Sequence, residues 1–319
     1  MISVTHVSKH FDNVAAVNDI SFEVKEGENL ILLGTSGCGK TTTLRMINRL
    51  IIPDSGSVQV NCANVNNQPP EQLRRSIGYV LQHNALFPHY TVAENIAVVP
   101  KLLQWDKKKI AARTEELMHA LQLAPEKYLH AYPAELSGGQ QQRVNVARAI
   151  AAYPPVLLMD EPFGALDPVT RAGIVKDFVA LDEFRKKTIV MVTHDIDEAF
   201  QLGNRICLMD KGEIVQIGTP IELLFRPANE QVKTFFDDHY LQLALKAIKI
   251  DDVWAKLNNN ILVQQDGNTL SAHSNIWDAM EMMTKNNWQQ LSVRNEMNNE
   301  IKQVNVAELL SAFNAYKNA

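Results

Sequence analysis

The stretch that decides the fold is Gly34-Thr35-Ser36-Gly37-Cys38-Gly39-Lys40-Thr41, which fits the phosphate-binding pattern G-x-x-x-x-G-K-[ST]. Its glycines let the backbone curl so that successive N–H groups converge on a phosphate above the positive end of the next helix. Lys40 would hold the β- and γ-phosphates, and the Thr41 hydroxyl would bind Mg²⁺. An apolar run at 30–33 and a helical apolar stripe at 41–50 flank the loop. The sequence therefore predicts a strand, loop and helix that bind a nucleoside triphosphate.

Two further apolar runs end in side chains suited to phosphate chemistry. Residues 156–159 lead into Asp160 and Glu161, and residues 188–192 lead into Thr193 and His194. Ligands of open α/β sheets sit beyond the carboxyl ends of the strands. We therefore expect Asp160 to hold magnesium, Glu161 to polarise an attacking water, and His194 to contact that water and the γ-phosphate. Acids or a histidine at a strand end are usually structural, but the phosphate loop favours the catalytic interpretation.

The arrangement of strands and helices indicates the fold class. Residues 1–33 have the pattern of β-structure, and the runs at 156–159 and 188–192 are typical of central parallel strands. Residues 106–122 and 139–152 are predicted to be helical. Strands that alternate with helices predict an α/β sheet with helices packed on its faces.

A second candidate anion site lies in Leu136-Ser137-Gly138-Gly139-Gln140, ahead of a helical run at 144–151. The exposed N–H groups and the helix dipole at this point favour an anion. A chain with two phosphate-binding helix starts binds two ligands, or it shares each ligand between two copies of itself.

Length and composition exclude several classes of protein. The chain has 319 residues and a net charge of −5, which argues against general nucleic-acid binding. Three widely spaced cysteines do not form a disulfide framework. The sequence opens without a signal-peptide pattern, and its apolar runs fall short of the roughly 18 residues that a membrane span needs. We expect a soluble, intracellular protein.

The composition changes near residue 237, where the chain becomes rich in asparagine and glutamine. A disordered polar tail is one interpretation. The opposing observations are helical spacing of Ile276, Met280 and Met283, a strand-like Leu291-Ser292-Val293, and a second helical pattern over 306–313. These patterns favour a small folded α/β domain.

Together, these segments resemble the ATP-binding subunit of an ATP-binding-cassette (ABC) transporter, over about residues 1–236. Residues 34–41 match the family's Walker A motif, 156–161 its Walker B motif, and 136–140 its signature motif. Gln82 matches the Q-loop, and Ala165-Leu166-Asp167 matches the D-loop.

The resemblance assigns roles to individual residues. It implies catalytic roles for Glu161, His194 and Gln82, and Mg²⁺ binding by Thr41, Gln82 and Asp160. Phe11 falls where the family stacks an aromatic ring on adenine, although a core aromatic is the alternative for Phe11. The implied ATP-binding residues are Phe11, Gly34, Thr35, Ser36, Gly37, Cys38, Gly39, Lys40, Thr41, Thr42, Ser137, Gly138, Gly139, Gln140 and Asp167.

Several segments are similar to one branch of the family, the bacterial importers of quaternary amines (glycine betaine, carnitine, choline). They are residues 42–50, 86–89, 97–102 and 163–168. Thr35 stands where that branch usually has proline. The branch also tends to carry CBS modules, and residues 249–315 resemble one such module, with 274–280 as its helix start and 290–293 as its strand. The resemblance therefore implies a nucleotide-binding domain over 1–236 and an accessory domain over 237–319 with a single CBS-like module.

The CBS-like module departs from its family at three positions. Lys302 takes the place of the usual glycine before its last strand, and Asn305 and Glu308 replace the usual ribose-binding Thr and Asp. These changes argue against adenine-nucleotide sensing by this module. Because such modules normally pair, the resemblance implies pairing across a dimer, or degeneration of the module.

The resemblance implies an ATPase that works as a homodimer on the cytoplasmic face of the cell membrane. Its partners would be membrane permease subunits and, indirectly, an extracytoplasmic solute-binding protein, with no nucleic acid. Two alternatives stay open: an importer ATPase for another small polar solute such as an amino acid, and a soluble ABC ATPase acting on nucleic acid or ribosomes. A generic phosphate-loop kinase or GTPase leaves residues 136–140 unexplained.

Leu86-Phe87-Pro88 is an apolar stretch in a segment that should be an exposed loop. We expect it to line the groove that receives a helix of the permease. A loop folded onto its own domain is the alternative.

Overall fold

The computed structural model describes residues 1–82, 86–164, 166–180, 184, 186–258 and 269–317. The chain contacts divide into two compact units, which we call the N-terminal unit (Met1–Ile217) and the C-terminal unit (Gly218–Ala319). This division falls ahead of the boundary at residue 236 that the composition suggested. Among the described residues, no helix combines the length and apolar character that a bilayer span requires.

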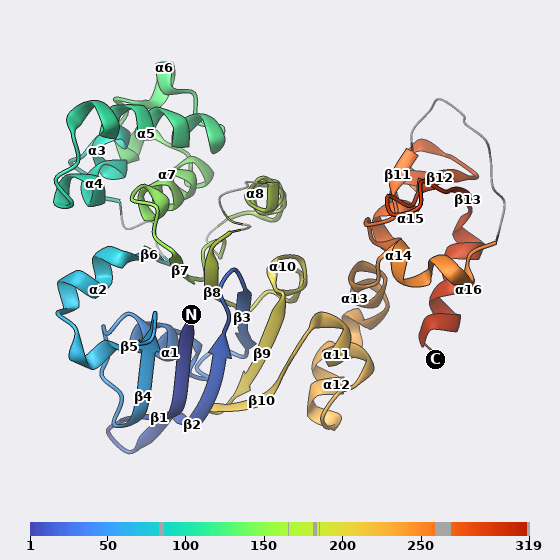
Figure 1. Ribbon diagram of the computed structural model, residues 1–319, viewed down its shortest axis with the longest axis horizontal. Helices are drawn as coiled ribbons and strands as arrows, with labels where there is room; N and C mark the ends of the chain where they lie inside the picture. Colours follow the sequence, from blue (N-terminus) through green and yellow to red (C-terminus); the bar gives the residue numbers. More distant parts are fainter. Residues whose placement is uncertain (83–85, 165, 181–183, 185, 259–268, 318–319) are drawn as a thin grey trace. The chain divides into compact units, whose positions relative to one another are not determined.

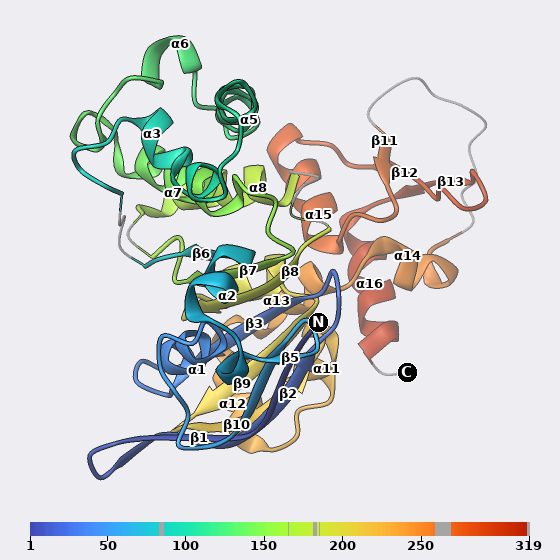
Figure 2. The same ribbon diagram turned by 60° about the vertical axis from the view of Figure 1, so that its left-hand side comes forward.

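A four-stranded antiparallel sheet forms one layer of the N-terminal unit. Its strands are β1 (Ile2–Phe11), β2 (Val14–Val24), β4 (Ser55–Val60) and β5 (Ala63–Asn64), in the order β2-β1-β4-β5. The β1–β2 hairpin extends beyond the other strands (Figure 2). Phe11 lies at the turn of this hairpin, where it pairs with Val14.

A six-stranded sheet forms the second layer, in the order β10-β9-β3-β8-β7-β6. Its strands are β3 (Asn29–Gly34), β6 (Ile77–Val80), β7 (Val156–Asp160), β8 (Thr188–Thr193), β9 (Arg205–Asp210) and β10 (Glu213–Gly218). The prediction of central parallel strands at 156–159 and 188–192 is confirmed, because β8 pairs in parallel with both β7 and β3.

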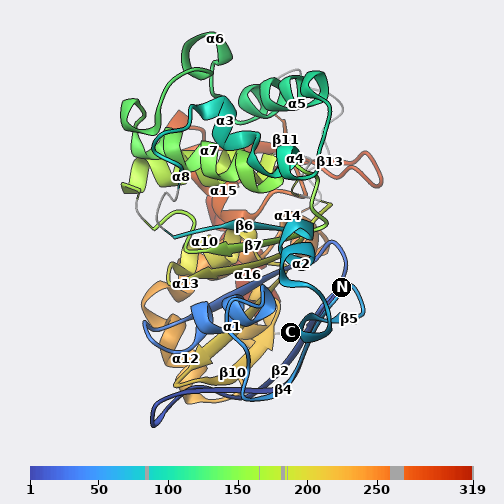
Figure 3. The same ribbon diagram turned by 90° about the vertical axis from the view of Figure 1, so that its left-hand side faces the viewer.

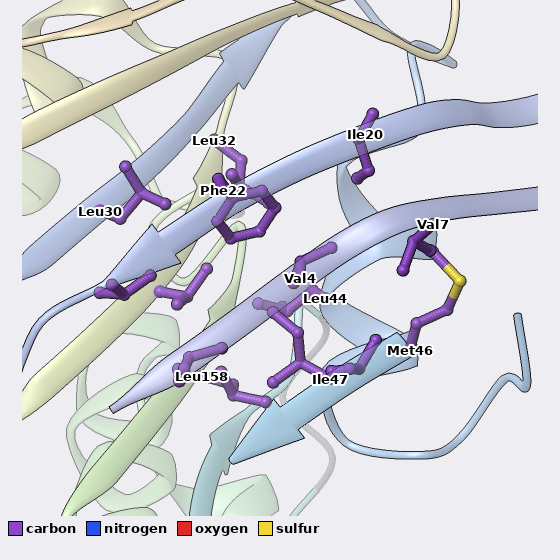
Figure 4. Packing of buried hydrophobic residues seen from close by; sticks show 14 of the residues in the cluster. Val4, Val7, Ile20, Phe22, Leu30, Leu32, Leu44, Met46, Ile47 and Leu158 are labelled. Carbon is purple, nitrogen blue, oxygen red and sulfur yellow. The ribbon is translucent and has the colours of Figure 1, made fainter. Parts of the chain in front are cut away.

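Helix α1 (Lys40–Ile47) lies between the two sheets. Successive side chains of a strand point to opposite faces. Leu32 of β3 therefore joins Leu44 and Ile47 of α1 and Val4 of β1 in one buried cluster (Figure 4). Ile31, the residue before Leu32 in β3, faces a pocket on the other side of the sheet, with Phe178 and Met191 among its neighbours. Burial on both faces explains the continuous apolar runs of these strands.

The helices of the N-terminal unit surround these sheets. Helix α2 (Pro70–Ser76) precedes β6, and α8 (Pro168–Ala180) and α10 (Ile196–Leu202) follow β7 and β8. A separate helical layer lies beyond the β6 edge of the six-stranded sheet (Figures 1 and 3). It contains α3 (Val92–Ile96), α4 (Val98–Leu102), α5 (Lys107–Ala120), α6 (Pro125–Tyr128) and α7 (Gly138–Ile150). The helices expected at 106–122 and 139–152 are thus confirmed. Helix α1 ends at Ile47, earlier than the expected residue 50, and Arg49 beyond it has a left-handed backbone (φ 50°).

The C-terminal unit is folded over its described residues, so the disordered-tail interpretation is wrong there. Its sheet has the order β11-β12-β13, in which β12 (Leu291–Arg294) pairs in parallel with β11 (Thr269–Ser271) and antiparallel with β13 (Ile301–Val304). The predicted strand at 291–293 and the two predicted helices are confirmed. The helices of this unit are α11 (Pro220–Phe225), α12 (Glu230–Phe236), α13 (Tyr240–Ala247), α14 (Ile250–Val253), α15 (Ile276–Asn286) and α16 (Val306–Lys317).

The position of the unit boundary predicts how shortened chains behave. A chain ending at Gly218 keeps every strand of both N-terminal sheets. A chain ending at Asp237 also keeps α11 but removes α13, whose Tyr240 ring lies 6.1 Å from the Phe225 ring. We expect the longer fragment to bind more of a hydrophobic dye and to aggregate more readily, because α11 then exposes apolar surface. Equal or lower dye binding by the longer fragment would contradict this boundary.

Candidate functional site

Four parallel strands end side by side at one edge of the six-stranded sheet. Leu33 of β3 pairs with Thr193 of β8, and Val192 of β8 pairs with Asp160 of β7. Val80 of β6 pairs with Met159 of β7. The phosphate loop, the acids at 160–161, His194 and Gln82 all follow these strand ends directly. Strand register therefore gathers residues that are far apart in the sequence.

The phosphate loop has a backbone that needs glycine. Gly34, Gly37 and Gly39 have φ of 150°, 82° and 101°. A Cβ atom on Gly39 would lie 2.4 Å from the carbonyl oxygen of Ala16. Thr35, Ser36 and Gly37 are exposed, so their backbone groups are open to a phosphate, whereas Cys38 is buried in the core.

Lys40 begins α1, and its ammonium group lies inside the loop. Its Nζ donates to the carbonyl oxygens of Gly34 and Thr35, both at 2.8 Å, and the side chain is 5% exposed. Thr41 and Thr42 follow in the first turn and are partly exposed. A cation on a flexible stem, enclosed by backbone groups, suits the recognition of a polyphosphate.

Thr41 and Asp160 form the candidate magnesium site. The Thr41 hydroxyl donates to Asp160 Oδ1 at 2.8 Å, and Asp160 is 1% exposed. Burial raises the pKa of the Asp160 carboxyl, while the Thr41 hydrogen bond and the charges of Arg45 and Lys40 oppose this rise. A buried carboxylate beside a hydroxyl supplies the hard oxygen ligands that Mg²⁺ prefers. These residues therefore fit a magnesium ion held jointly by the protein and phosphates.

Glu161 lies between Gln82 and His194. Gln82 Nε2 donates to Glu161 Oε2 at 2.9 Å, and His194 Nδ1 lies 3.2 Å from the same oxygen. The Glu161 side chain is 19% exposed, and the His194 side chain is 55% exposed. Glu161 has a left-handed backbone (φ 43°), which is uncommon for a residue with a side chain and recurs at functional sites. All three predicted catalytic residues therefore meet at one carboxylate.

The signature segment opens α7, in the helical layer. The Ser137 hydroxyl accepts from Gln140 N at 3.4 Å, and Gln140 Oε1 accepts from Ser137 N at 2.9 Å. Gly138 and Gly139 are the first two helical residues, so the helix starts earlier than the sequence suggested. Ser137 and Gly138 are exposed at this helix start, where N–H groups without intrahelical partners face outward.

Phe11 and Asp167 lie outside this central cluster. Phe11 is 46% exposed, so the core-aromatic alternative is wrong. Asp167 Oδ1 accepts from Thr170 N at 3.0 Å and thereby caps α8. Ala165, the first residue of the expected D-loop, lies outside the described residues.

Sequence reasoning missed two side chains beside the site. Tyr79 lies near Asp160, and burial together with the Asp160 charge raises the pKa of the tyrosine to about 12. Arg171 of α8 pairs with Asp195, the residue after His194. Tyr79 lies three residues before Gln82, but the Q-loop match gives it no role of its own, and only the folded chain brings Arg171 to the site.

Comparisons with known proteins agree with this geometry. The sequence profile of the ABC transporter family matches residues 17–164. The osmoprotectant import ATP-binding protein OsmV of Salmonella typhimurium is 50% identical over 258 residues, which cover 79% of this chain and 68% of OsmV. The glycine betaine/carnitine/choline transport ATP-binding protein OpuCA of Bacillus subtilis is 52% identical over 236 residues. These residues cover 74% of this chain and 62% of OpuCA, so the chain spans less than two thirds of that relative.

Among solved structures, the dimeric structure of MJ0796, a bacterial ABC transporter cassette, has a TM-score of 0.62 and 35% sequence identity. It covers 69% of this chain and 98% of the cassette.

Two of the loop glycines, Gly37 and Gly39, should differ in their tolerance of alanine. Both have a positive φ, which costs a residue with a side chain about 1–2 kcal/mol. A Cβ on Gly37 meets nothing within 4 Å, but a Cβ on Gly39 meets the Ala16 carbonyl. We expect Gly39→Ala to lower the thermal unfolding midpoint clearly more than Gly37→Ala, measured without nucleotide. A matching loss in both variants would show that sterics at Ala16 do not constrain the loop.

Proposed function

The chain belongs to the ABC transporter family, and we propose that it is the ATP-hydrolysing subunit of an importer for a quaternary amine such as glycine betaine, carnitine or choline. The observation that carries the hydrolytic part is the contact of Gln82 and His194 with one Glu161 oxygen, beside the Thr41–Asp160 pair. Phosphoryl transfer to water requires a carboxylate, an imidazole, magnesium ligands and a phosphate loop, and these groups lie together here.

Each residue has a distinct task in this reaction. Lys40 and the loop N–H groups bind the phosphates and stabilise their developing charge. Glu161 accepts a hydrogen bond from the attacking water and orients it. His194 contacts the water and the γ-phosphate, and Gln82 holds the carboxylate in place. Thr41, Asp160 and Gln82 would hold a magnesium ion, which would neutralise charge on the phosphates.

Two copies of the chain would complete two sites. In each, the phosphate loop of one copy would face Ser137, Gly138 and Gly139 of the other, while Gln140 fixes that helix start and Phe11 stacks on adenine. The exposure of Ser137 and Gly138 supports this arrangement, because their N–H groups are open to a ligand. So does the dimeric form of the similar MJ0796 cassette. Asp167 would lie close to the dimer contact.

The substrate class rests on the relatives. OsmV is named an osmoprotectant import protein, and OpuCA a glycine betaine/carnitine/choline transport protein. Both are named ATP-binding proteins, so a separate permease at the membrane would carry the solute, with a solute-binding protein on the far side. The chain would then act on the cytoplasmic face of that membrane. Another small polar solute is the remaining alternative.

We propose that the C-terminal unit is a CBS-like module that does not bind a nucleotide. Asn305 and Glu308 are hydrogen-bonded to each other at the start of α16, at 2.9 and 3.1 Å, and Glu308 Oε1 also accepts from Asn258. Lys302 is buried and donates to the carbonyl oxygens of Trp254 and Leu257. With these groups engaged within the unit, contact between two copies is the role that we propose for it.

The loop at 86–88 is the proposed contact with the permease. Phe87 is 46% exposed, whereas Leu86 is buried, so only part of the predicted apolar stretch is available. Asn95 of α3 is fully buried and holds the loop: its Oδ1 accepts from Phe87 N, and its Nδ2 donates to the carbonyl oxygens of Phe87 and Tyr90. A loop that is held by a buried side chain and presents an aromatic ring suits a docking site.

Two substitutions separate catalysis from binding. We expect Glu161→Gln to keep ATP affinity, to reduce turnover by about 100-fold or more, and to trap an ATP-bound dimer visible by size-exclusion chromatography. Lys40→Ala should instead lose ATP affinity. Glu116→Gln, a change of the same chemistry at an exposed site on α5, is the control. A Glu161→Gln protein with a near wild-type turnover would refute the assignment.

Phe87→Asp tests the proposed docking loop. A charge on the exposed ring position should prevent assembly with the permease, because the contact buries apolar surface, while the ATPase rate of the isolated subunit stays unchanged. Met297→Asp, at an 83% exposed position of the C-terminal unit, serves as the control. Co-purification with the permease and solute uptake are the measurements, and normal uptake by Phe87→Asp would exclude this contact.

A further inference from the structure

Arg171 joins two segments that border the proposed catalytic site. Its Nη1 lies 2.8 Å from Asp195 Oδ2, and its Nη2 donates to the Leu166 carbonyl oxygen at 3.2 Å. Its Nε lies 3.8 Å from Glu198 Oε1. Leu166 directly precedes Asp167, and Asp195 directly follows His194. One guanidinium group therefore contacts both the turn before α8 and the turn that carries the histidine.

The turn that carries His194 is held by a closed set of hydrogen bonds. Asp195 N donates to Thr193 Oγ1 at 3.0 Å, and Glu198 N donates to Asp195 Oδ1 at 3.1 Å. Thr193 Oγ1 in turn donates to Glu198 Oε2 at 2.6 Å. Asp195 thereby caps α10 with one carboxylate oxygen and contacts Arg171 with the other. The backbone of His194 is fixed by β8 on one side and by Asp195 on the other.

Arg171 supplies a positive charge that offsets part of the negative charge around this turn. Glu198 is 5% exposed, and burial raises the pKa of its carboxyl, an effect that the neighbouring Asp195 charge increases. The Thr193 hydrogen bond and the positive charge of Arg171 oppose the rise. Without Arg171, the carboxylates of Asp195 and Glu198 would lose the guanidinium group that contacts both of them.

The imidazole of His194 depends on this backbone support. Its side chain is 55% exposed, so it is not locked in place by surrounding side chains, yet it must stay 3.2 Å from Glu161 Oε2. For a group that is not packed, the position of its backbone decides where the ring lies. A small displacement of a catalytic group causes a large loss of rate.

We infer that Arg171 is a positioning residue for hydrolysis, which holds His194 against Glu161 by fixing Asp195 and Glu198 to the turn that precedes α8. This inference rests on the proposed ATPase function. Arg171 need not touch ATP itself, since its three contacts are all with the protein. Its planar fork of donors allows it to hold several acceptors at once, which the single ammonium group of a lysine does less well.

The test measures ATP binding and ATP turnover separately in the full-length protein. We expect Arg171→Gln to lower kcat by about tenfold or more, the scale of a misplaced catalytic group, while the dissociation constant for ATP changes by about twofold or less. Arg171→Lys should recover part of the lost rate. A purely structural role predicts a different pattern, in which rate, binding and thermal stability fall together.

Arg205→Gln is the matched control. Arg205 also bridges a carboxylate and a carbonyl, with Nη1 2.9 Å from Glu28 Oε1 and 3.2 Å from the Glu23 carbonyl oxygen. It begins β9, at the end of the sheet opposite the phosphate loop. The control variant should keep its turnover. A loss of kcat in Arg205→Gln equal to that in Arg171→Gln would overturn the inference.

A double-mutant cycle with Asp195→Asn tests the route of the effect. Asparagine keeps an oxygen to cap α10 but removes the charge that Arg171 contacts. If Arg171 acts through Asp195, the double variant should lose no more kcat than the larger single loss. If the fold-losses of kcat in the two single variants multiply in the double variant, the inference is overturned. A wild-type kcat in Arg171→Gln would overturn it as well.

Different results would disprove this inference and the proposed function. If the wild-type chain, assembled with its permease, hydrolyses no ATP, or Glu161→Gln keeps full turnover, the proposed function is wrong. If the wild type hydrolyses ATP and Glu161→Gln does not, but Arg171→Gln behaves as the wild type, only the positioning role is wrong.

Discussion

The parallel register of β3, β8 and β7 is the constraint on which the rest of the site depends. These strands are buried on both faces, and a slip of one residue would turn the side chains of one strand toward the wrong layer. Packing against α1 on one side and α8 on the other therefore fixes the register. Because the register is fixed, the strands end level, and Lys40, Asp160 and His194 follow from adjacent ends. The apolar core thus sets the geometry of a polar site.

The polar groups at these strand ends are buried or have a strained backbone, and both features cost free energy of folding. Lys40 and Asp160 are almost fully buried, and Glu161 has a left-handed backbone. Burial of charge is unfavourable without partners, and the partners here are weak ones: two carbonyl groups for Lys40 and one hydroxyl for Asp160. Phosphate and magnesium would be stronger partners for both. Binding of the proposed ligand, which carries both charges, would therefore relieve a cost that folding imposes.

Local chemistry explains which features could be predicted from the sequence. The phosphate loop, the acids after β7 and the capped start of α7 depend on neighbours within a few residues, so a short motif contains the information. The buried strands β7 and β8 were predictable because both of their faces are apolar. Strand β9 carries no such motif, and its pairing with β3 joins residues that are far apart in the sequence. The unit boundary was missed because α11 and α12 belong by packing, rather than by composition, to the residues that follow them.

Arg171 shows most clearly why motif reading finds a site but not its support. The residues that touch substrate must present fixed chemistry at fixed spacing, so they form recognisable runs. Arg171 only has to reach a carboxylate and a carbonyl, and a helix can bring such a residue there from many sequence positions. Its partner Asp195 is the N-cap of α10, a role that the local sequence already accounts for. The sequence therefore gives no sign of the second contact of Asp195, with Arg171. The sequence thus identifies the groups that meet at Glu161, while the fold identifies how the exposed His194 ring is kept there.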